Sequence, residues 1–184
     1  MTVPSDSSLG FRSLTRDDFP LLSAWLSSPH VLRWWKEPFD TAAIEARYGP
    51  VVNGTDPTEC LIVERHGSPV GFIQRYLLAD NPEWQASLAV AGTPGNAAGI
   101  DFFVGIETLI GVDLGPEIIS EFVDATWLRY PRIEAIVVNV SPENRRSWRA
   151  LEKAGFQRIW SGPLVSDDTS DTGPSHVYVR HRVG

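Results

Sequence analysis

A glycine-containing turn in the second half of the chain has the residue types of an anion-binding site. It connects an expected strand that ends near Val104 to an expected helix that begins at Pro116. The free backbone N–H groups and the positive dipole end of such a helix attract a phosphate or another anion. A plain strand-to-helix connection explains the same residues equally well. The turn consists of Ile110, Gly111, Val112, Asp113, Leu114 and Gly115. It lacks the Lys-Ser/Thr pair of a P-loop and the full spacing of a dinucleotide fingerprint, which disfavours NTP or NAD binding.

Neither cysteine nor histidine chemistry is indicated by the residue pattern. The single cysteine, Cys60, begins the apolar run Cys-Leu-Ile-Val, where a thiol is expected to be buried and inert. The four histidines are scattered without the spacing of metal ligands, so no metal site is expected. They are His30, His66, His176 and His181.

The balance of charge limits the partners of the protein. Its 184 residues include 16 Lys or Arg and 23 Asp or Glu, which gives a formal net charge of −7. A surplus of carboxylates without a Lys/Arg run argues against nucleic acid as the main partner, because phosphate contacts require clustered cations. The charge favours cationic or neutral partners, and it serves solubility equally well.

Length and hydropathy predict one domain over residues 1–184, with a loose leader rich in Ser and Pro at residues 1–10. No apolar stretch approaches the roughly 18 residues that span a bilayer, and the first residues lack the pattern of a signal peptide. We therefore expect a cytoplasmic protein without a membrane partner, present as a monomer or a weak homodimer.

Hydrophobic spacing and capping residues predict the elements of the first half. After a short strand at residues 11–14, Thr15 is a good N-cap for a helix that ends near Ser28 and carries Asp17 and Asp18 in its first turn. A second helix is expected from Thr41 to Tyr48, started by Asp40 or Thr41 and ended before Gly49-Pro50.

Two apolar runs at residues 59–65 and 69–78, joined by His66-Gly67-Ser68, predict an antiparallel hairpin. Residues 79–98 are interrupted by Pro and Gly, and within them Ser87 to Val90 could form a poor strand.

The second half alternates strands and helices. Pro116 suits the first position of a helix, because its missing N–H has no partner there. Residues Ala154-Gly155 resemble a helix C-cap. The expected elements are a strand at 99–104, a helix at 116–128, a strand at 133–140, a helix at 144–154 and strands at 156–160 and 176–182. Together they predict a mixed α/β (α+β) domain.

The segment from Val137 to Phe156 carries the most specific pattern. Within it a strand is followed by Asn144, by Ser147 three residues later, and by Leu-Glu-Lys-Ala-Gly-Phe. This pattern resembles the signature of the GCN5-related N-acetyltransferases (GNAT), in which an earlier Arg/Gln-x-x-Gly-x-Gly/Ala motif binds the pyrophosphate of acetyl-coenzyme A through its amides. The turn at 110–115 is in the matching place, and the resemblance covers the chain from Phe11 to its end. It implies a central mixed, mostly antiparallel, twisted sheet flanked by about four helices.

Short stretches of the first half are most similar to the aminoglycoside 6′-N-acetyltransferases. They are His30 to Trp35, Gly71 to Tyr76, Asp80 with Trp84, and Gly99 to Asp101. Siderophore-pathway acyltransferases share a related start that contains Trp. An aminoglycoside is a polycation, and a cleft with Asp80, Glu83, Asp101 and either Asp167 or Asp168 would attract it and bind its ammonium groups.

Aromatic and polar side chains outside the apolar periodicity are candidates for the walls of this cleft. Of the adjacent Trp34 and Trp35, one is expected in the core and the other beside the substrate ring. Gln74 and Tyr76 lie two apart on a strand, so they face the same side. Trp84 stands in a polar stretch, where no apolar pattern explains an indole.

The resemblance implies direct transfer of the acetyl group from acetyl-coenzyme A to a primary amine. The amine must lose a proton, so a carboxylate has to accept it directly or through water. Asp101 is the expected base, with Glu107 as the alternative. A binding carboxylate, or one paired with an Arg, is an equally open interpretation of Asp101. Backbone N–H groups around Phe103 and Val104 would stabilise the charge that develops on the thioester oxygen.

Three residues depart from the family pattern. Asp113 replaces the first glycine of the pyrophosphate motif, Ile110 replaces its Arg/Gln, and Leu151 stands where many relatives carry a Tyr that could protonate the leaving thiolate. Asp113 would repel a pyrophosphate if it pointed inward, so we expect it to point outward and cap the following helix.

Three functional hypotheses follow. The first is acetylation of an aminoglycoside with acetyl-coenzyme A as co-substrate, in which Asn144 also reaches the cofactor. The second is acylation of another amine, such as a siderophore hydroxylysine or a polyamine. The third is a non-catalytic relative that only binds ligand, which Asp113 and Leu151 would explain.

Overall fold

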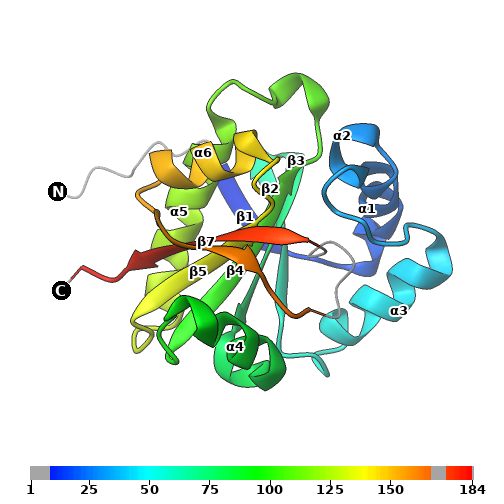
Figure 1. Ribbon diagram of the computed structural model, residues 1–184. Helices are drawn as coiled ribbons and strands as arrows, with labels where there is room; N and C mark the ends of the chain where they lie inside the picture. Colours follow the sequence, from blue (N-terminus) through cyan, green and yellow to red (C-terminus); the bar gives the residue numbers. More distant parts are fainter. Residues whose placement is uncertain (1–8, 167–172, 184) are drawn as a thin grey trace, which may run out of the picture.

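Seven strands form one twisted sheet in the spatial order β1-β2-β3-β4-β5-β7-β6 (Figure 1). The computed structural model describes residues 9–166 and 173–183. All neighbouring strands are antiparallel except β4 and β5, which confirms the expected mixed, mostly antiparallel sheet. The strands are β1 (Leu9–Ser13), β2 (Glu59–Arg65), β3 (Ser68–Leu77), β4 (Ala97–Val104), β5 (Ala135–Val140), β6 (Gln157–Pro163) and β7 (Pro174–His181).

The two parallel strands separate along their length. β4 and β5 pair only where Ala97–Gly99 faces Ala135–Val137. Beyond Gly99, β4 keeps its pairing with β3, while β5 keeps its pairing with β7. The sheet therefore opens between the carboxyl halves of β4 and β5, and backbone groups on the facing edges lose their partners across the gap.

Helices cover both faces of the sheet and form two separate cores. On one face, α5 (Leu114–Arg129) and α6 (Arg145–Lys153) pack over Ile73, Ile100 and Ile136. On the other face, α1 (Phe19–Leu26) and α3 (Thr41–Val52) enclose Ile62 and Phe72. Burial of these side chains, worth roughly 1.5–3 kcal/mol each, fixes the helices on the sheet.

The start of the chain follows its capping residues. Thr15 precedes a 3-10 turn at Arg16–Asp18 that leads into α1, and Asp18 accepts hydrogen bonds from the Thr15 N–H and hydroxyl, each at 2.9 Å. Asp40 starts α3 by accepting the N–H of Ala43 at 3.0 Å. A short helix, α2 (Pro29–Leu32), lies between them and was not expected.

The expected end of α3 is wrong. The helix continues through Gly49 and Pro50 to Val52. Pro50 is in the last turn, where the carbonyl groups of Gly49 and Pro50 accept the N–H groups of Asn53 and Thr55, both at 2.9 Å. Proline removes only one hydrogen bond so close to a helix end, and burial of Tyr48 holds the helix in place.

The expected strand at Ser87–Val90 is also wrong. That stretch ends α4 (Pro82–Leu88) and continues as a 3-10 turn, Ala89–Ala91. Pro82 occupies the first helical position, and Trp84 and Leu88 are four residues apart, so both face the cluster formed with Val137 and Val177. The shared burial of Trp84 and Leu88, together with Pro82 at the helix start, favours a helix more strongly than the local apolar run favours a strand.

The remaining boundaries are close to the expected ones, with one informative difference. α5 begins at Leu114, so Pro116 is its third residue and not its first. The first N–H groups of a helix have no partner within it, so proline is tolerated at this position as well. The end of α6 matches expectation, because Gly155 has a φ of 84° and Phe156 donates its N–H to Leu151 at 3.0 Å.

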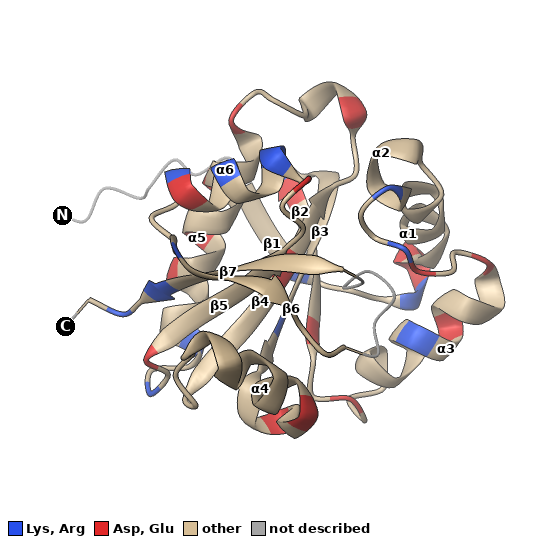
Figure 2. Ribbon diagram, viewed as in Figure 1, with Lys and Arg blue, Asp and Glu red and all other residues tan. Residues whose placement is uncertain are grey.

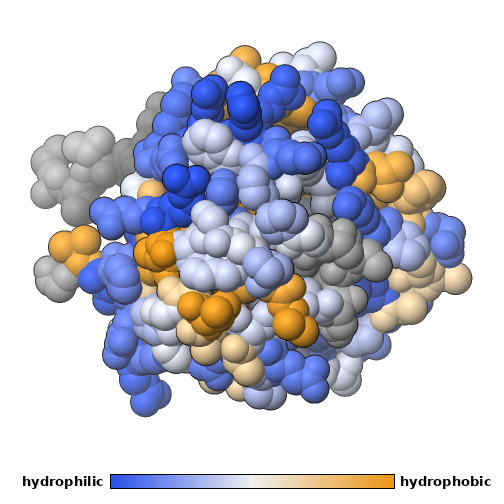
Figure 3. Space-filling model, viewed as in Figure 1, coloured by the Kyte–Doolittle hydropathy of each residue, from blue (hydrophilic) through white to orange (hydrophobic). Residues whose placement is uncertain are grey.

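Within the part of the chain that the structure describes, no helix is long and apolar enough to cross a membrane. The face seen in Figure 3 is largely hydrophilic, and its hydrophobic side chains form separate patches.

Candidate active site

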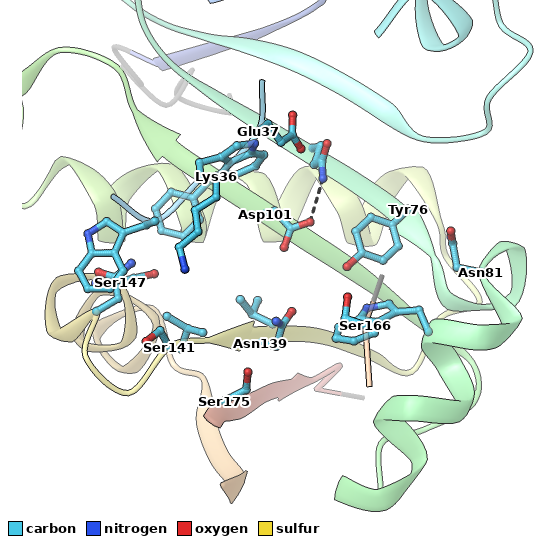
Figure 4. Close-up of a pocket in the computed structure, with 18 of the residues that line it drawn as sticks. Lys36, Glu37, Tyr76, Asn81, Asp101, Asn139, Ser141, Ser147, Ser166 and Ser175 are labelled. Carbon is cyan, nitrogen blue, oxygen red and sulfur yellow. Dashed lines mark hydrogen bonds between the residues drawn. The ribbon is translucent and has the colours of Figure 1, made fainter. Parts of the chain in front are cut away.

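A cleft of about 1160 Å³ lies where β4 and β5 separate. The connection between α2 and α3 forms one wall, α4 with the turn before it forms another, and the start of α6 closes one end (Figure 4). The structure brings together eight of the residues expected to bind substrate, and Asn144 lines the same cleft. They are Trp34, Trp35, Gln74, Tyr76, Asp80, Glu83, Trp84 and Asp101.

Asp101 lies at the floor of the cleft, half-buried on β4. Gln74 on β3 is its direct cross-strand neighbour and donates Nε2–H to the Asp101 Oδ2 at 2.9 Å (Figure 4). Gln74 is itself buried, and its Oε1 is 3.7 Å from the Cys60 Sγ. The amide therefore holds the carboxylate in one orientation, a function that its position in the sequence did not indicate.

Tyr76 reaches the cleft because Gly99 leaves room for its ring. The two residues face each other across β3 and β4. A Cβ atom on Gly99 would lie 2.3 Å from the Tyr76 Cζ, closer than any stable contact. Gln74 and Tyr76 share one face of β3 and line the same cleft, as their spacing predicts.

Both adjacent tryptophans line the cleft, but only Trp35 also packs against the core. The Trp35 ring packs edge-on against Phe72 and Phe103, with centroids 5.8 and 5.1 Å away. Trp34 extends along the cleft, with the Arg33 guanidinium 4.7 Å from its ring. Trp84 also lines the cleft, but it does so from helix α4 and not from a loop.

Acidic side chains dominate the lining of the cleft. Six carboxylates and three cations face it. Two of the carboxylates, Asp80 and Glu83, belong to the α4 wall, and Figure 2 shows acidic residues at α4. The carboxylates are Glu37, Asp56, Asp80, Glu83, Asp101 and Glu143, and the cations are Arg33, Lys36 and Arg47. The cations belong to the wall of α2 and α3, so the negative charge is concentrated at α4 and the floor. Such a cleft attracts cationic ligands.

Glu37 was not expected in the site. It accepts the Tyr48 hydroxyl at 2.7 Å and lies 3.6 Å from the Arg47 guanidinium. Burial, followed by the negative charge of Glu37, raises the pKa of Tyr48. The pair fixes the connection that carries Trp34 and Trp35 against α3. Glu37 follows the two tryptophans within an irregular connection, so no periodicity could have assigned it.

Other polar residues of the lining were also missed. Asn139 interrupts the apolar run of β5, and an amide in such a run is a signal that the sequence does contain. Ser147 lies in the first turn of α6, and the remaining residues come from loops or strand ends. The missed residues are Lys36, Asn81, Asn139, Ser141, Ser147, Ser166 and Ser175.

The turn at 110–115 lies outside this cleft, at the start of α5. Gly111 has a φ of 87° and Asp113 has a φ of 59°, so the chain makes a tight left-handed turn there. Asp113 points outward, with 76% of its side chain exposed, and accepts the Lys153 ammonium at 2.5 Å. The outward orientation agrees with expectation, whereas the expected capping bond is absent and the ion pair to α6 takes its place.

Backbone geometry distinguishes between the two expected oxyanion donors. Gly105 donates its N–H to Val70 on β3 at 2.9 Å. Bonded positions alternate in an antiparallel pair, so the N–H of Phe103 also points to β3, and its side chain is in the core. The N–H groups of Phe102 and Val104 point the other way, into the gap beside β5. The Val104 carbonyl lies 3.1 Å from the His30 Nε2.

Several other candidates lie elsewhere. Glu107, the alternative base, is exposed on a 3-10 turn and does not line the cleft. Asp167 and Asp168 fall outside the described residues. Cys60 is buried, and burial raises its pKa to about 12, so its thiol stays protonated at neutral pH.

A family model described as an acetyltransferase (GNAT) domain matches residues 15–161. This chain belongs to the GNAT acetyltransferases. Among curated relatives of this GNAT chain, the aminoglycoside N(6′)-acetyltransferase type 1 of Klebsiella pneumoniae is 28% identical over 183 residues, which are 97% of this chain and 85% of that protein.

Solved GNAT structures agree with this assignment. Aminoglycoside acetyltransferase AAC(6′)-Ib in complex with coenzyme A gives a TM-score of 0.80 at 26% identity, over 95% of each chain. The same enzyme with ribostamycin and coenzyme A gives 0.79 at 28% identity, over 95% of this chain and 94% of that one. Spermidine N-acetyltransferase from Vibrio cholerae, at 13% identity and a TM-score of 0.70 over 96% of each chain, shares the fold alone.

Proposed function

We propose that this GNAT protein transfers the acetyl group of acetyl-coenzyme A to the 6′-amine of an aminoglycoside. The observation that carries the proposal is the position of Asp101, on the floor of an acidic, tryptophan-lined cleft at the open edge of β4. Relatives named as aminoglycoside N(6′)-acetyltransferases over nearly the whole chain support the choice of acceptor.

Coenzyme A would bind between the start of α5 and the cation-bearing side of α6. In our proposal its pyrophosphate binds the backbone of residues 110–115. The contact between Asp113 and Lys153 brings the end of α6 to this turn. Arg146, Arg149 and Lys153 are three or four residues apart, so they follow one side of α6 and supply cations near the phosphates.

Asn144 and the edge of β4 would place the thioester. Asn144 is the N-cap of α6, with its Oδ1 accepting the N–H of Ser147 at 3.3 Å, so its amide nitrogen is the group that would reach the cofactor. The Val104 N–H, directed into the gap, would donate to the thioester oxygen as negative charge develops on it. The N–H of Phe103 points to β3 and its ring is buried in the core, so Phe103 is left out of the proposed thioester contacts.

Asp101 would act as the general base. It accepts a proton from the acceptor ammonium, directly or through one water, while Gln74 keeps its carboxylate oriented toward the cleft. Asp80 and Glu83 would bind other ammonium groups of the same acceptor. Trp34, Trp84 and Tyr76 would cover the apolar faces of its rings.

A thiol-release assay with acetyl-coenzyme A tests this function directly. Kanamycin is compared with an aminoglycoside that carries a hydroxyl in place of the 6′-amine, and with hydroxylysine and spermine. We expect rapid release with kanamycin only, and NMR of the product should place the acetyl group on the 6′-nitrogen. Release with hydroxylysine or spermine alone would reject the aminoglycoside and keep acyl transfer. If no acceptor gives release although coenzyme A binds, the non-catalytic hypothesis replaces the proposal.

A further inference from the structure

Lysine is rare in this protein, and one of its two lysines lies in the cleft. Lys36 and Lys153 are the only lysines among the 16 Lys or Arg of the sequence. Lys153 is on α6 and pairs with Asp113 on the surface, whereas Lys36 follows Trp34 and Trp35 and lines the same cleft as Asp101. The two residues therefore offer the same primary amine in two different surroundings.

The Lys36 side chain extends into the cavity from the wall formed by the α2–α3 connection. In Figure 4 its ammonium nitrogen lies between the labelled Asp101 and Ser147. Asp101 and Phe102 of β4 line the same cleft as Lys36. A primary amine is thus tethered in the cleft that holds the proposed base.

We propose that Lys36 is itself an acceptor, and that the protein acetylates its own Lys36 when acetyl-coenzyme A is bound and the acceptor cleft is empty. This proposal rests on the acetyl transfer proposed above. A group held by a short flexible tether is present at an effective concentration of roughly millimolar, so Lys36 competes when the free acceptor is scarce.

The reaction follows the same steps as transfer to an external amine. The Lys36 ammonium first gives one proton to Asp101, directly or through water. The Nζ lone pair then forms a C–N bond to the thioester carbonyl carbon, and the C–S bond breaks. Coenzyme A leaves as the thiolate, which takes up the second nitrogen proton or leaves it to water. The products are an acetamide on Lys36 and free coenzyme A.

Modification would change the electrostatics of the cleft. Six carboxylates and three cations line it, and acetylation removes one of the three cations. Attraction of a polycationic acceptor would therefore increase.

Mass spectrometry of the full chain tests the proposal. The protein is incubated with acetyl-coenzyme A without acceptor, and acetyl occupancy is mapped on Lys36 and on Lys153, which serves as the internal control. We expect occupancy of Lys36 to exceed that of Lys153 by at least about tenfold, because only Lys36 reacts at the effective concentration set by its tether. Its rate should not depend on protein concentration, and saturating kanamycin should suppress it.

Two variants separate enzymatic from chemical acetylation. Asp101→Asn should lower Lys36 occupancy and leave Lys153 occupancy unchanged, and Lys36→Arg should abolish the fast-modified site. Equal occupancy of both lysines that persists in Asp101→Asn would identify chemical acetylation and overturn the proposal.

Thiol release with kanamycin, measured in the same preparation, distinguishes the two proposals. If kanamycin is acetylated while Lys36 stays unmodified, self-acetylation is wrong and the proposed function stands. If Lys36 is modified while no aminoglycoside reacts, the proposed acceptor is wrong and self-acetylation stands. Failure of both reactions rejects both.

Discussion

The substitution Asp101→Asn separates a general base from a carboxylate that only binds the acceptor. Asn keeps the size of Asp and an oxygen that can still accept the Gln74 N–H, now 2.9 Å from Asp101 Oδ2, so the floor of the cleft should persist. It cannot take up a proton. Loss of a general base typically costs about 10²–10⁴ in rate, which corresponds to about 3–5 kcal/mol in activation free energy.

The effect on binding should be much smaller. An exposed or half-exposed charge contributes about 1 kcal/mol or less to holding an ammonium group, which is about fivefold in KM. We therefore expect kcat to fall by at least about a hundredfold while KM changes by about fivefold or less. The acidic limb of the pH–rate profile should disappear with the carboxylate.

Steady-state thiol release with kanamycin measures both constants. Asp80→Asn is the matched control, because it makes the same chemical change in the same cleft, on the α4 wall away from Asp101. It should raise KM, increasingly so at low ionic strength, and leave kcat nearly unchanged. A thermal melt checks that both variants fold. An unchanged kcat in folded Asp101→Asn would refute the assignment of Asp101 as the base.

Three further predictions concern stability and the lining of the cleft. Gly99→Ala should displace the Tyr76 ring, cost about 1–3 kcal/mol of stability and raise KM. Gly10→Ala is the control, because no atom lies within 4 Å of its new Cβ, and it should have none of these effects. Equal melting temperatures of the two variants would contradict this prediction. The pKa of the Asp18 carboxyl is lowered, first by its hydrogen bond to Arg12. The carboxylate therefore stabilises the fold above the unfolded-state pKa of about 3.9. This stabilisation is lost as the pH falls through the lower folded-state pKa. Denaturant unfolding should accordingly show Asp18→Asn to be less stable than wild type at pH 7, with a difference that shrinks below about pH 4. Lys36→Gln should give a lower KM for kanamycin than Lys36→Arg at low salt, and an equal KM for the two would show that this cation does not affect acceptor binding.

The sheet and most helices could be predicted because their apolar residues recur with the period of the element. Ile118, Ile119, Phe122 and Val123 predict the buried side of α5, and all four are fully buried. The separation of β4 from β5 could not be predicted in this way. It depends on which strands pair over which residues, and Ile100 to Val104 is as apolar as a strand paired on both sides.

The same limit applies to the cleft. Asp80 and Asp101 were found through the resemblance to the aminoglycoside 6′-N-acetyltransferases, and Trp84 also because no apolar pattern explains an indole in its stretch. Lys36 and Glu37 lie in an irregular connection, where the position of a residue in the sequence does not indicate in which direction its side chain points. The place of Glu37 depends on a contact with another element, the hydrogen bond from the Tyr48 hydroxyl on α3.

The departures from the family pattern have different consequences in the folded chain. Asp113 turns its carboxylate to the surface and pairs with Lys153, so its charge is directed away from the turn and partly neutralised. Its backbone adopts the left-handed conformation that a glycine would supply, which keeps the shape of the turn at the cost of some strain.

Leu151 has no such compensation. It is fully buried in the core between α6 and the sheet, in contact with the cluster that contains Val138 and Phe156. A buried hydroxyl at this position would require a hydrogen-bond partner. The leucine side chain has no hydroxyl and therefore no proton to give to a leaving group. In the proposed transfer, the departing thiolate would take its proton from water. A thiol has an ordinary pKa of about 8.5, so its anion is a weak base and a good leaving group, and we expect loss of this acid to slow the reaction less than loss of the base at Asp101.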